Sequence, residues 1–141
     1  MRWRSRLTDE GDHDEKGIDV TLLFVCLGAA VGAPTRYLTD RFISSRHDSL
    51  FPWGTFIVNV VGSLLFGVLV GAATHLRVPV EAMAAGGIGF CGALTTYSTF
   101  GYETARLVEG GARLVAVLNV VASLTAGFGA AVLGYALGKI L

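Results

Sequence analysis

Long stretches without a charged residue constrain this chain more than any other feature. Four of them are evident, at residues 20–35, 49–76, 82–102 and 114–138. An α-helix rises ~1.5 Å per residue and the hydrocarbon core of a bilayer is ~30 Å thick, so the last three are long enough to span it. The first is slightly short and is expected to continue to about Leu38.

Composition agrees with this interpretation, because 52% of the residues are hydrophobic and only 16% are charged. Such values are far from those of a soluble globular domain. We therefore predict an all-α membrane protein with four transmembrane helices, at about residues 20–38, 51–76, 82–105 and 113–139. The expected location is the inner or plasma membrane, with the lipid bilayer as a partner and no nucleic acid.

The remaining residues, 1–19, form a polar segment that we expect to be a disordered extension. It carries basic and acidic side chains, and the acidic ones intervene before the first apolar run. A signal peptide has its basic region directly before that run, so this segment does not resemble one. Cys26 and Cys91 lie inside apolar spans and are interpreted as packing residues. No CxxC or HExxH spacing occurs, and no enzymatic activity is predicted.

The third apolar stretch, residues 82–102, has no charge but an unusual polar content. Glycines crowd its first half, and Thr95, Thr96, Ser98 and Thr99 crowd its second. Irregular backbone at membrane depth survives where it is buried in protein or lines a wet cavity. In transporters such interrupted helices mark the ion or substrate site. The third helix is therefore predicted to be interrupted, and function is expected there.

Gly92 and Thr95 flank the expected interruption. Unwound backbone exposes carbonyl oxygens, which suit a hard cation such as Na⁺. The alternative is that the glycines of this segment only allow close packing.

Two asparagines lie inside apolar spans, each with a serine one helical turn later: Asn59 with Ser63, and Asn119 with Ser123. Amides at that depth need partners, because an unpaired polar group there costs a few kcal/mol. Hydrogen bonds between helices would satisfy them. Alternatively, their N–H and O–H groups are donors for an anion path.

Two aromatic residues and one arginine extend this hypothesis. Tyr97 and Phe100 share a helix face, and ring edges are electropositive, so they could line an anion path without a full charge. Such helical aromatics are otherwise core or lipid contacts. Arg36, near the end of the first span, could snorkel to the interface or raise the local anion concentration at a vestibule.

Orientation and assembly are less constrained. Lys and Arg divide six to five between the two sides, which leaves either one dominant segment or insertion in both orientations. Three GxxxG motifs, at residues 28–32, 67–71 and 134–138, allow close helix contact within a subunit or between subunits. Four short helices are too few to fill an interior and also enclose a polar route, so an oligomer is expected.

Three strings together resemble the Fluc, or CrcB, family of fluoride channels: GAAVGAPTRY (28–37), GTFIVNVVGS (54–63) and GFCGALTTYSTFGYE (89–103). The resemblance implies a passive fluoride-selective channel that exports cytoplasmic F⁻ for fluoride resistance. It also implies an antiparallel, dual-topology homodimer with two pores and a structural Na⁺ at its centre.

Residue by residue, the resemblance assigns Asn59 to the pore and places the family's pore phenylalanines at Tyr97 and Phe100. Ser123 matches a hydroxyl of a polar track, and Arg36 matches a vestibule arginine. The backbone carbonyls of Gly92 and Thr95 match the Na⁺ ligands.

Two departures concern Tyr97, where phenylalanine is common, and Asn119, where a tyrosine is expected. Because some members work as pairs of unlike subunits, pairing with a homologous second chain stays an alternative. Two other functions also stay open: a small dual-topology, proton-coupled multidrug exporter and a non-transporting membrane assembly protein. Against the exporter, the sequence places no Asp or Glu well inside a span, and proton coupling needs such a group.

Overall fold

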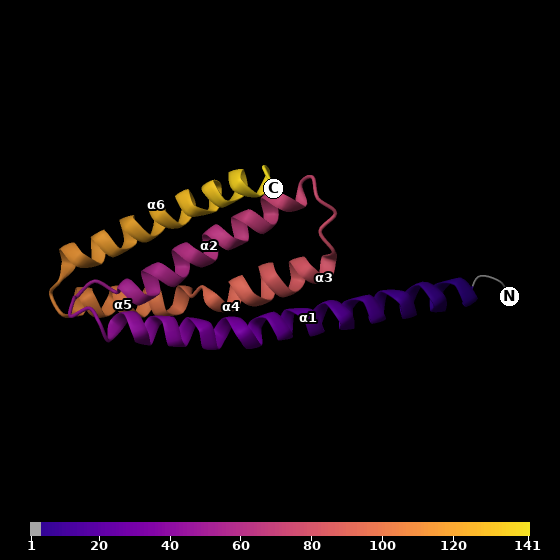
Figure 1. Cartoon of the computed structure of the whole chain (residues 1–141). Helices are drawn as coiled ribbons and strands as arrows, with labels where there is room; N and C mark the ends of the chain where they lie inside the picture. Colours follow the sequence, from indigo (N-terminus) through magenta and orange to yellow (C-terminus); the bar gives the residue numbers. More distant parts are fainter. Residues whose placement is uncertain (1–3) are drawn as a thin grey trace.

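The fold is known from a computed structural model, which describes the backbone of residues 4–141 and the side chains from residue 17 onward. Every element in that range is helical (Figure 1). In chain order the elements are α1 (Arg4–Ser44), α2 (Trp53–Ala73), α3 (Val80–Ala82), η1 (Met83–Cys91), α4 (Gly92–Leu94), α5 (Tyr97–Glu109) and α6 (Arg113–Gly138).

Among the residues that the structure describes, three helices are long and apolar enough to cross a membrane: the Gly17–Ser44 part of α1, and the whole of α2 and of α6. The protein is therefore a membrane protein. Two of the expected spans agree closely with α2 and α6, whereas α1 runs six residues beyond the expected end at Leu38. Thr35 and the residues after it continue the helix past Pro34, and the Thr35 hydroxyl donates to the Val31 carbonyl at 2.7 Å.

At its other end, α1 begins at Arg4, so the structure does not show the expected disordered extension for residues 4–19. These residues include good helix formers and no proline, and a helix that is already nucleated propagates at little cost. At ~1.5 Å per residue, the 41 residues of α1 span roughly twice the hydrocarbon thickness. Part of α1 must therefore lie outside the membrane. The division of the chain into a tail and a membrane domain stays a prediction.

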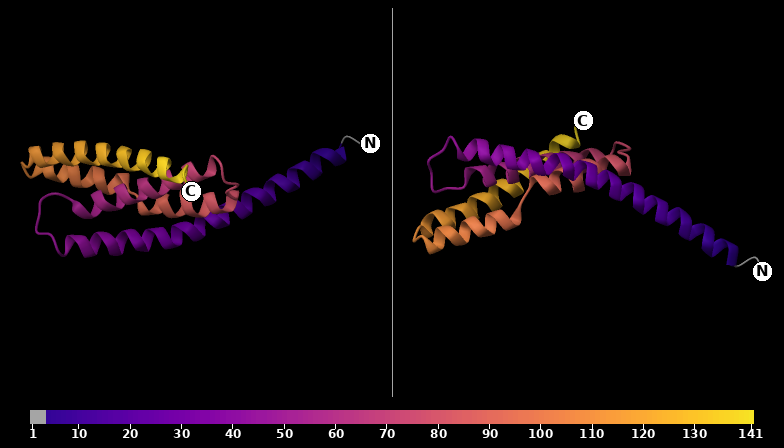
Figure 2. Two further views of the ribbon diagram at one scale, coloured as in Figure 1. Left: turned by 45° about the horizontal axis from the view of Figure 1, so that its top comes forward. Right: turned by 90° about the horizontal axis from the view of Figure 1, so that it is seen from below.

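Glycines bring α2 and α6 into backbone contact, and the two helices lie side by side (Figure 1, Figure 2). A methyl group at Gly67 would overlap the Ala131 carbonyl, and one at Gly134 would overlap the Leu64 carbonyl. The motif at residues 28–32 packs in the same way against η1. All three GxxxG motifs thus serve contacts within one chain.

The third apolar stretch is helical from Val80 to Glu109 but is interrupted at Thr95 and Thr96. Its first part contains η1, a nine-residue π-helix rich in glycine. Both residues of the interruption are extended, with φ −81° and ψ 155° at Thr95 and φ −148° and ψ 124° at Thr96. The predicted interruption is confirmed, and α5 continues as a separate helix (Figure 2).

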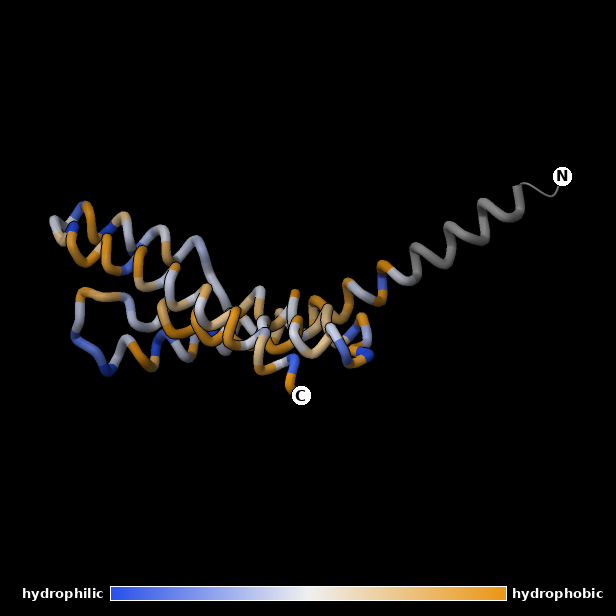
Figure 3. The backbone as a smooth tube through the Cα atoms, turned by 90° about the horizontal axis from the view of Figure 1, so that it is seen from above, coloured by the Kyte–Doolittle hydropathy of each residue, from blue (hydrophilic) through white to orange (hydrophobic). Residues whose placement is uncertain are grey.

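Many large apolar residues of the helices are exposed within a single chain. Hydrophobic residues recur along each of the long helices (Figure 3). Within one chain, only 6%, 28% and 11% of the most apolar windows of α1, α2 and α6 are buried. Lipid or other protein must cover the rest of these surfaces.

Candidate functional site

Asn59 of α2 binds the interruption of the third apolar stretch through both ends of its amide. The Thr96 N–H donates to Asn59 Oδ1 at 2.7 Å, and Asn59 Nδ2 donates to the Thr96 carbonyl at 3.1 Å. This two-point pairing fixes the amide orientation, because rotation by 180° would set donor against donor. One hydrogen of Nδ2 remains for another acceptor.

Thr96 also begins α5. Its hydroxyl oxygen accepts the Thr99 N–H at 3.3 Å, which is an N-cap contact. The Thr96 hydroxyl proton is directed to Thr99 Oγ1 at 3.1 Å. The interruption is therefore held by side chains as well as by the neighbouring helices.

The extended backbone at Thr95 and Thr96 leaves several main-chain carbonyls without their helical partners, among them those of Gly92 and Thr95. In a continuous helix Gly92 O would accept the Thr96 N–H, and Thr95 O would accept the Thr99 N–H. Both N–H groups instead bind side-chain oxygens, on Asn59 and Thr96 respectively. The carbonyl oxygens of Gly92 and Thr95 are therefore available to another ligand. A Cβ atom added at Gly92 would meet open space, so this position faces the outside of the chain.

A groove of about 290 Å³ lies beside the interruption. It is formed by α2, the interruption with the start of α5, and α6. Its lining comprises Asn59, Ser63, Thr95, Thr96, Tyr97, Phe100, Ser123, Leu124 and Gly127. The structure thus brings together five of the six residues expected to form the pore, although they come from parts of the sequence up to 64 positions apart.

The groove contains hydroxyl and amide groups but no charged side chain. Asn59 contributes its second N–H. Ser63 makes no side-chain hydrogen bond to any residue that the structure describes, so its hydroxyl is free. The Thr95 hydroxyl is occupied, because it donates to the Cys91 carbonyl at 3.0 Å. Neutral donors therefore define the chemistry of this surface.

Aromatic rings border the groove. The centroids of Tyr97 and Phe100 are 6.1 Å apart and their planes are inclined by 42°. Phe100 is partly buried, whereas 86% of Tyr97 is exposed. One edge of the groove is thus open within a single chain.

Asn119, the sixth expected pore residue, does not line the groove. It is 1% exposed and lies between α6 and α5, where its Nδ2 donates to Thr104 Oγ1 at 2.9 Å. Its Oδ1 accepts the hydroxyl of Ser123 at 3.4 Å. Within one chain the Asn119 amide is taken by Thr104 and Ser123, and its assignment to the pore stays a prediction.

Arg36 is also separate from the groove. It lines a cavity of about 150 Å³ together with Asp40, Thr55 and Thr99, among others. Thr96 lines both this cavity and the groove. Arg36 thus belongs to a separate cavity, which has only Thr96 in common with the groove.

Residues 23–135 match the family model described as CrcB-like protein, Camphor Resistance (CrcB). The chain belongs to the CrcB family. The matched range begins within α1 and ends within α6, so it contains the whole groove and the interruption.

Several relatives of this CrcB chain carry a functional name. A protein of Frankia casuarinae named Fluoride-specific ion channel FluC 1 is 56% identical over 122 residues, which cover 83% of this chain and 95% of that protein. A protein of the same name from Streptomyces avermitilis is 54% identical over 118 residues, 79% of this chain and 90% of that one. Another, from Nocardia farcinica, is 47% identical over 129 residues, 92% of this chain and 88% of that one.

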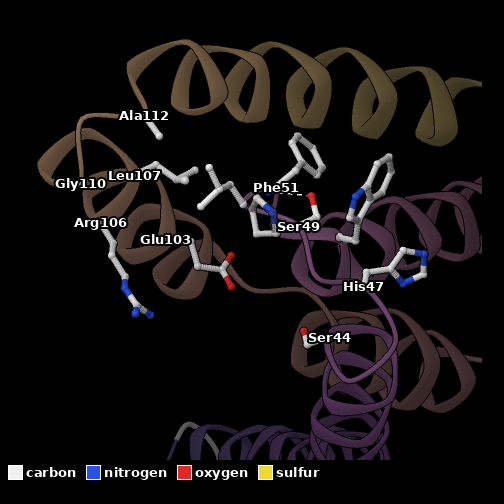
Figure 4. Close-up of a pocket in the computed structure, with 12 residues that line it drawn as sticks. Ser44, His47, Ser49, Phe51, Glu103, Arg106, Leu107, Gly110 and Ala112 are labelled. Atoms are coloured by element: carbon white, nitrogen blue, oxygen red, sulfur yellow. Dashed lines mark hydrogen bonds between the residues drawn. The ribbon is translucent and has the colours of Figure 1, made fainter.

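Glu103, which the predicted span 82–105 places near its end, lies inside this CrcB fold. Glu103 is in the middle of α5, and its Oε2 atom is buried without a hydrogen-bond partner among the described residues. It lines a second cavity of about 480 Å³ with His47, Phe51 and Trp53 (Figure 4). A signal was present, because the helix can be expected to continue from Glu103 to the glycine pair at 110–111.

Charged side chains of both signs, Glu103 and Arg106, line this second cavity, whereas the groove offers only neutral groups. None of the residues expected to form the pore lines the second cavity, and five of them line the groove. The groove is therefore the candidate functional site.

Proposed function

We propose that this chain forms a passive, fluoride-selective ion channel that lets F⁻ leave the cytoplasm through the cytoplasmic membrane. The observation that carries the proposal is the groove, where uncharged donors and an aromatic pair converge from α2, α5 and α6. The names of the relatives support the same ion.

The composition of the groove suits F⁻. This ion is small and strongly hydrated, so a pore must replace its water with closely spaced donors. Asn59 and Ser63 supply N–H and O–H groups, and the edges of Tyr97 and Phe100 are electropositive. A lysine or arginine in the groove would bind the ion more tightly, whereas conduction requires that it also leave.

One chain supplies only part of a pore. The groove is open beside Tyr97, and most of the apolar surface of α1 and α6 is uncovered. We infer that a second copy in the opposite orientation closes it, which gives an antiparallel, dual-topology homodimer. The nearly even division of Lys and Arg between the two sides agrees with insertion in both directions.

The released carbonyls of Gly92 and Thr95 fit a hard monovalent cation, because they are neutral oxygen donors at an open position of the chain. We propose that they hold a structural Na⁺ where two copies meet. When bound, the ion would supply positive charge to a site built only from main-chain dipoles.

Efflux from liposomes tests the channel proposal. Purified protein is reconstituted into vesicles loaded with potassium fluoride, valinomycin is added, and released fluoride is followed with a selective electrode. We expect rapid efflux that needs no pH gradient, while chloride-loaded vesicles leak no faster than protein-free ones. Fluoride release at the protein-free rate would reject the proposal, and release that requires a proton gradient would favour the exporter.

Topology is tested separately. An epitope is attached to the C-terminus, and an antibody is added to the outside of sealed vesicles. About half of the epitopes should be accessible in right-side-out vesicles and about half in inverted vesicles. Reactivity from one side only would reject the antiparallel arrangement and leave the efflux result standing.

A further inference from the structure

The strongest unexplained feature is a chain of hydrogen bonds behind the groove. Ser123, which lines the groove, donates to Asn119 Oδ1 at 3.4 Å. Asn119 Nδ2 donates to Thr104 Oγ1 at 2.9 Å, and the Thr104 hydroxyl donates to the Phe100 carbonyl at 2.7 Å. Asn119 and Thr104 do not line the groove. They can therefore affect an ion there only through other residues.

In this arrangement the Ser123 hydroxyl faces the wrong way for an anion. A serine has one hydroxyl proton, and here it is used by Asn119. The oxygen lone pairs then remain for the groove, and they would repel F⁻. Ser123 can stabilise the ion only if its proton is released.

Rotation of the Asn119 amide by 180° would release this proton. The oxygen and nitrogen of an amide are nearly equal in size, so the rotation exchanges acceptor and donor with little change of shape. Nδ2 would then donate to Ser123 Oγ, and Oδ1 would accept from the Thr104 hydroxyl. Phe100 O would lose that hydroxyl but keep the Thr104 N–H of helix α5.

The number of hydrogen bonds does not change in this exchange. Before rotation the three bonds run from Ser123 to Asn119, from Asn119 to Thr104 and from Thr104 to the Phe100 carbonyl. After rotation they run from Thr104 to Asn119, from Asn119 to Ser123 and from Ser123 to the ion. The released proton therefore costs no unpaired buried group.

We propose that Asn119 and Thr104 are positioning residues, and that rotation of the Asn119 amide turns the Ser123 hydroxyl into a donor for the ion in the groove. This inference rests on the proposed channel function and names the groups that direct one donor of its pore.

Two substitutions should change the flux in opposite directions. In Asn119→Leu no amide N–H donates to Ser123. The Ser123 hydroxyl should then donate to the main-chain carbonyl four residues earlier, as serines in helices do, and its proton is not available to the ion. Fluoride flux should therefore fall about tenfold. In Thr104→Val one end of the Asn119 amide faces a methyl group. Because an unpaired buried oxygen is tolerated better than an unpaired N–H, Oδ1 should lie against the introduced valine and Nδ2 should donate to Ser123. The Ser123 proton is then free for the ion, and the flux should equal or exceed that of the wild type.

Both variants are also made in a Ser123→Ala background, and all five proteins are measured against the wild type in the efflux assay. We expect each effect to vanish there, because residues that act through one side chain are not additive with its removal. If the contact between α5 and α6 is merely structural, both substitutions lower the flux, and they do so equally in either background. That result would overturn the inference.

The design separates this inference from the channel proposal. A wild type without fluoride efflux would reject the channel itself. If the wild type conducts but the effects of the Asn119 and Thr104 substitutions add to that of Ser123→Ala, only the positioning role of Asn119 is rejected. If Asn119→Leu does not assemble, the Thr104→Val pair still decides, since a fall in flux that persists without the Ser123 hydroxyl contradicts the proposal.

Discussion

Replacing Asn59 by aspartate gives the sharpest test of the groove, because it changes one amide nitrogen into an oxygen. The Thr96 N–H keeps its acceptor at 2.7 Å, but the Thr96 carbonyl loses the donor that lies 3.1 Å away. Loss of one partner of a part-buried hydrogen bond costs about 1–3 kcal/mol. Folding and assembly should therefore survive, since proteins are stable by roughly 5–15 kcal/mol.

Conduction should suffer much more than stability. An ion held by the second N–H of Asn59 would lie ~4 Å from the new charge, where two like charges repel by about 4 kcal/mol at an effective dielectric constant of ~20. At about 1.4 kcal/mol per tenfold, this corresponds to a loss of roughly a thousandfold in fluoride flux.

Asn59→Leu is the matched control, because it removes both contacts with Thr96 but adds no charge. In the efflux assay, with assembly checked by size-exclusion chromatography, Asn59→Asp should conduct less than Asn59→Leu. If the leucine variant is the poorer conductor, anchoring of Thr96 outweighs charge, and the assignment of Asn59 as a donor to the ion is refuted.

Three further predictions follow from the packing, the rings and the cation site. Gly134→Val should destabilise the fold by about 3 kcal/mol or prevent folding, because its side chain would overlap the Leu64 carbonyl. In the control Gly129→Ala the added methyl group meets open space, so thermal unfolding in detergent should be nearly unchanged. Phe100→Ile should lower fluoride flux at least tenfold without changing assembly, while the 75% exposed Phe128→Ile leaves the flux unchanged; equal rates in the efflux assay would remove the ring from the pore. Replacing Na⁺ by N-methylglucamine during purification should lower the unfolding temperature, and re-addition of Na⁺ should restore it. An unfolding temperature that is the same with either cation would contradict a structural Na⁺ site.

Much of the architecture could be predicted from the sequence, because long uncharged apolar stretches predict membrane-spanning helices. The ends of α2 and α6 agree closely with the expected spans, and the interruption lies where the glycine-rich half of the third stretch meets the hydroxyl-rich half. The convergence of Asn59, Ser63, Tyr97, Phe100 and Ser123 on one groove also agrees with the family resemblance.

The parts that could not be predicted depend on contacts between distant residues. Spacing alone shows that Asn119 is at membrane depth, but not that Thr104 on another helix takes its amide. Likewise, nothing local indicates that Asn59 binds the backbone of Thr96 on both sides. The predicted third span ends at about residue 105, whereas α5 continues to Glu109, so Glu103 lies in the middle of a helix and not near its end.

Thr96 forms part of the wall of two compartments, the groove that contains the donors and the cavity that Arg36 lines. Asn59 holds the N–H and carbonyl groups of Thr96 by two hydrogen bonds, so a substitution that lets Thr96 move changes the shape of the groove and of the second compartment together. Phenotypes at Asn59 and Arg36 should consequently be correlated even though the two side chains line different cavities.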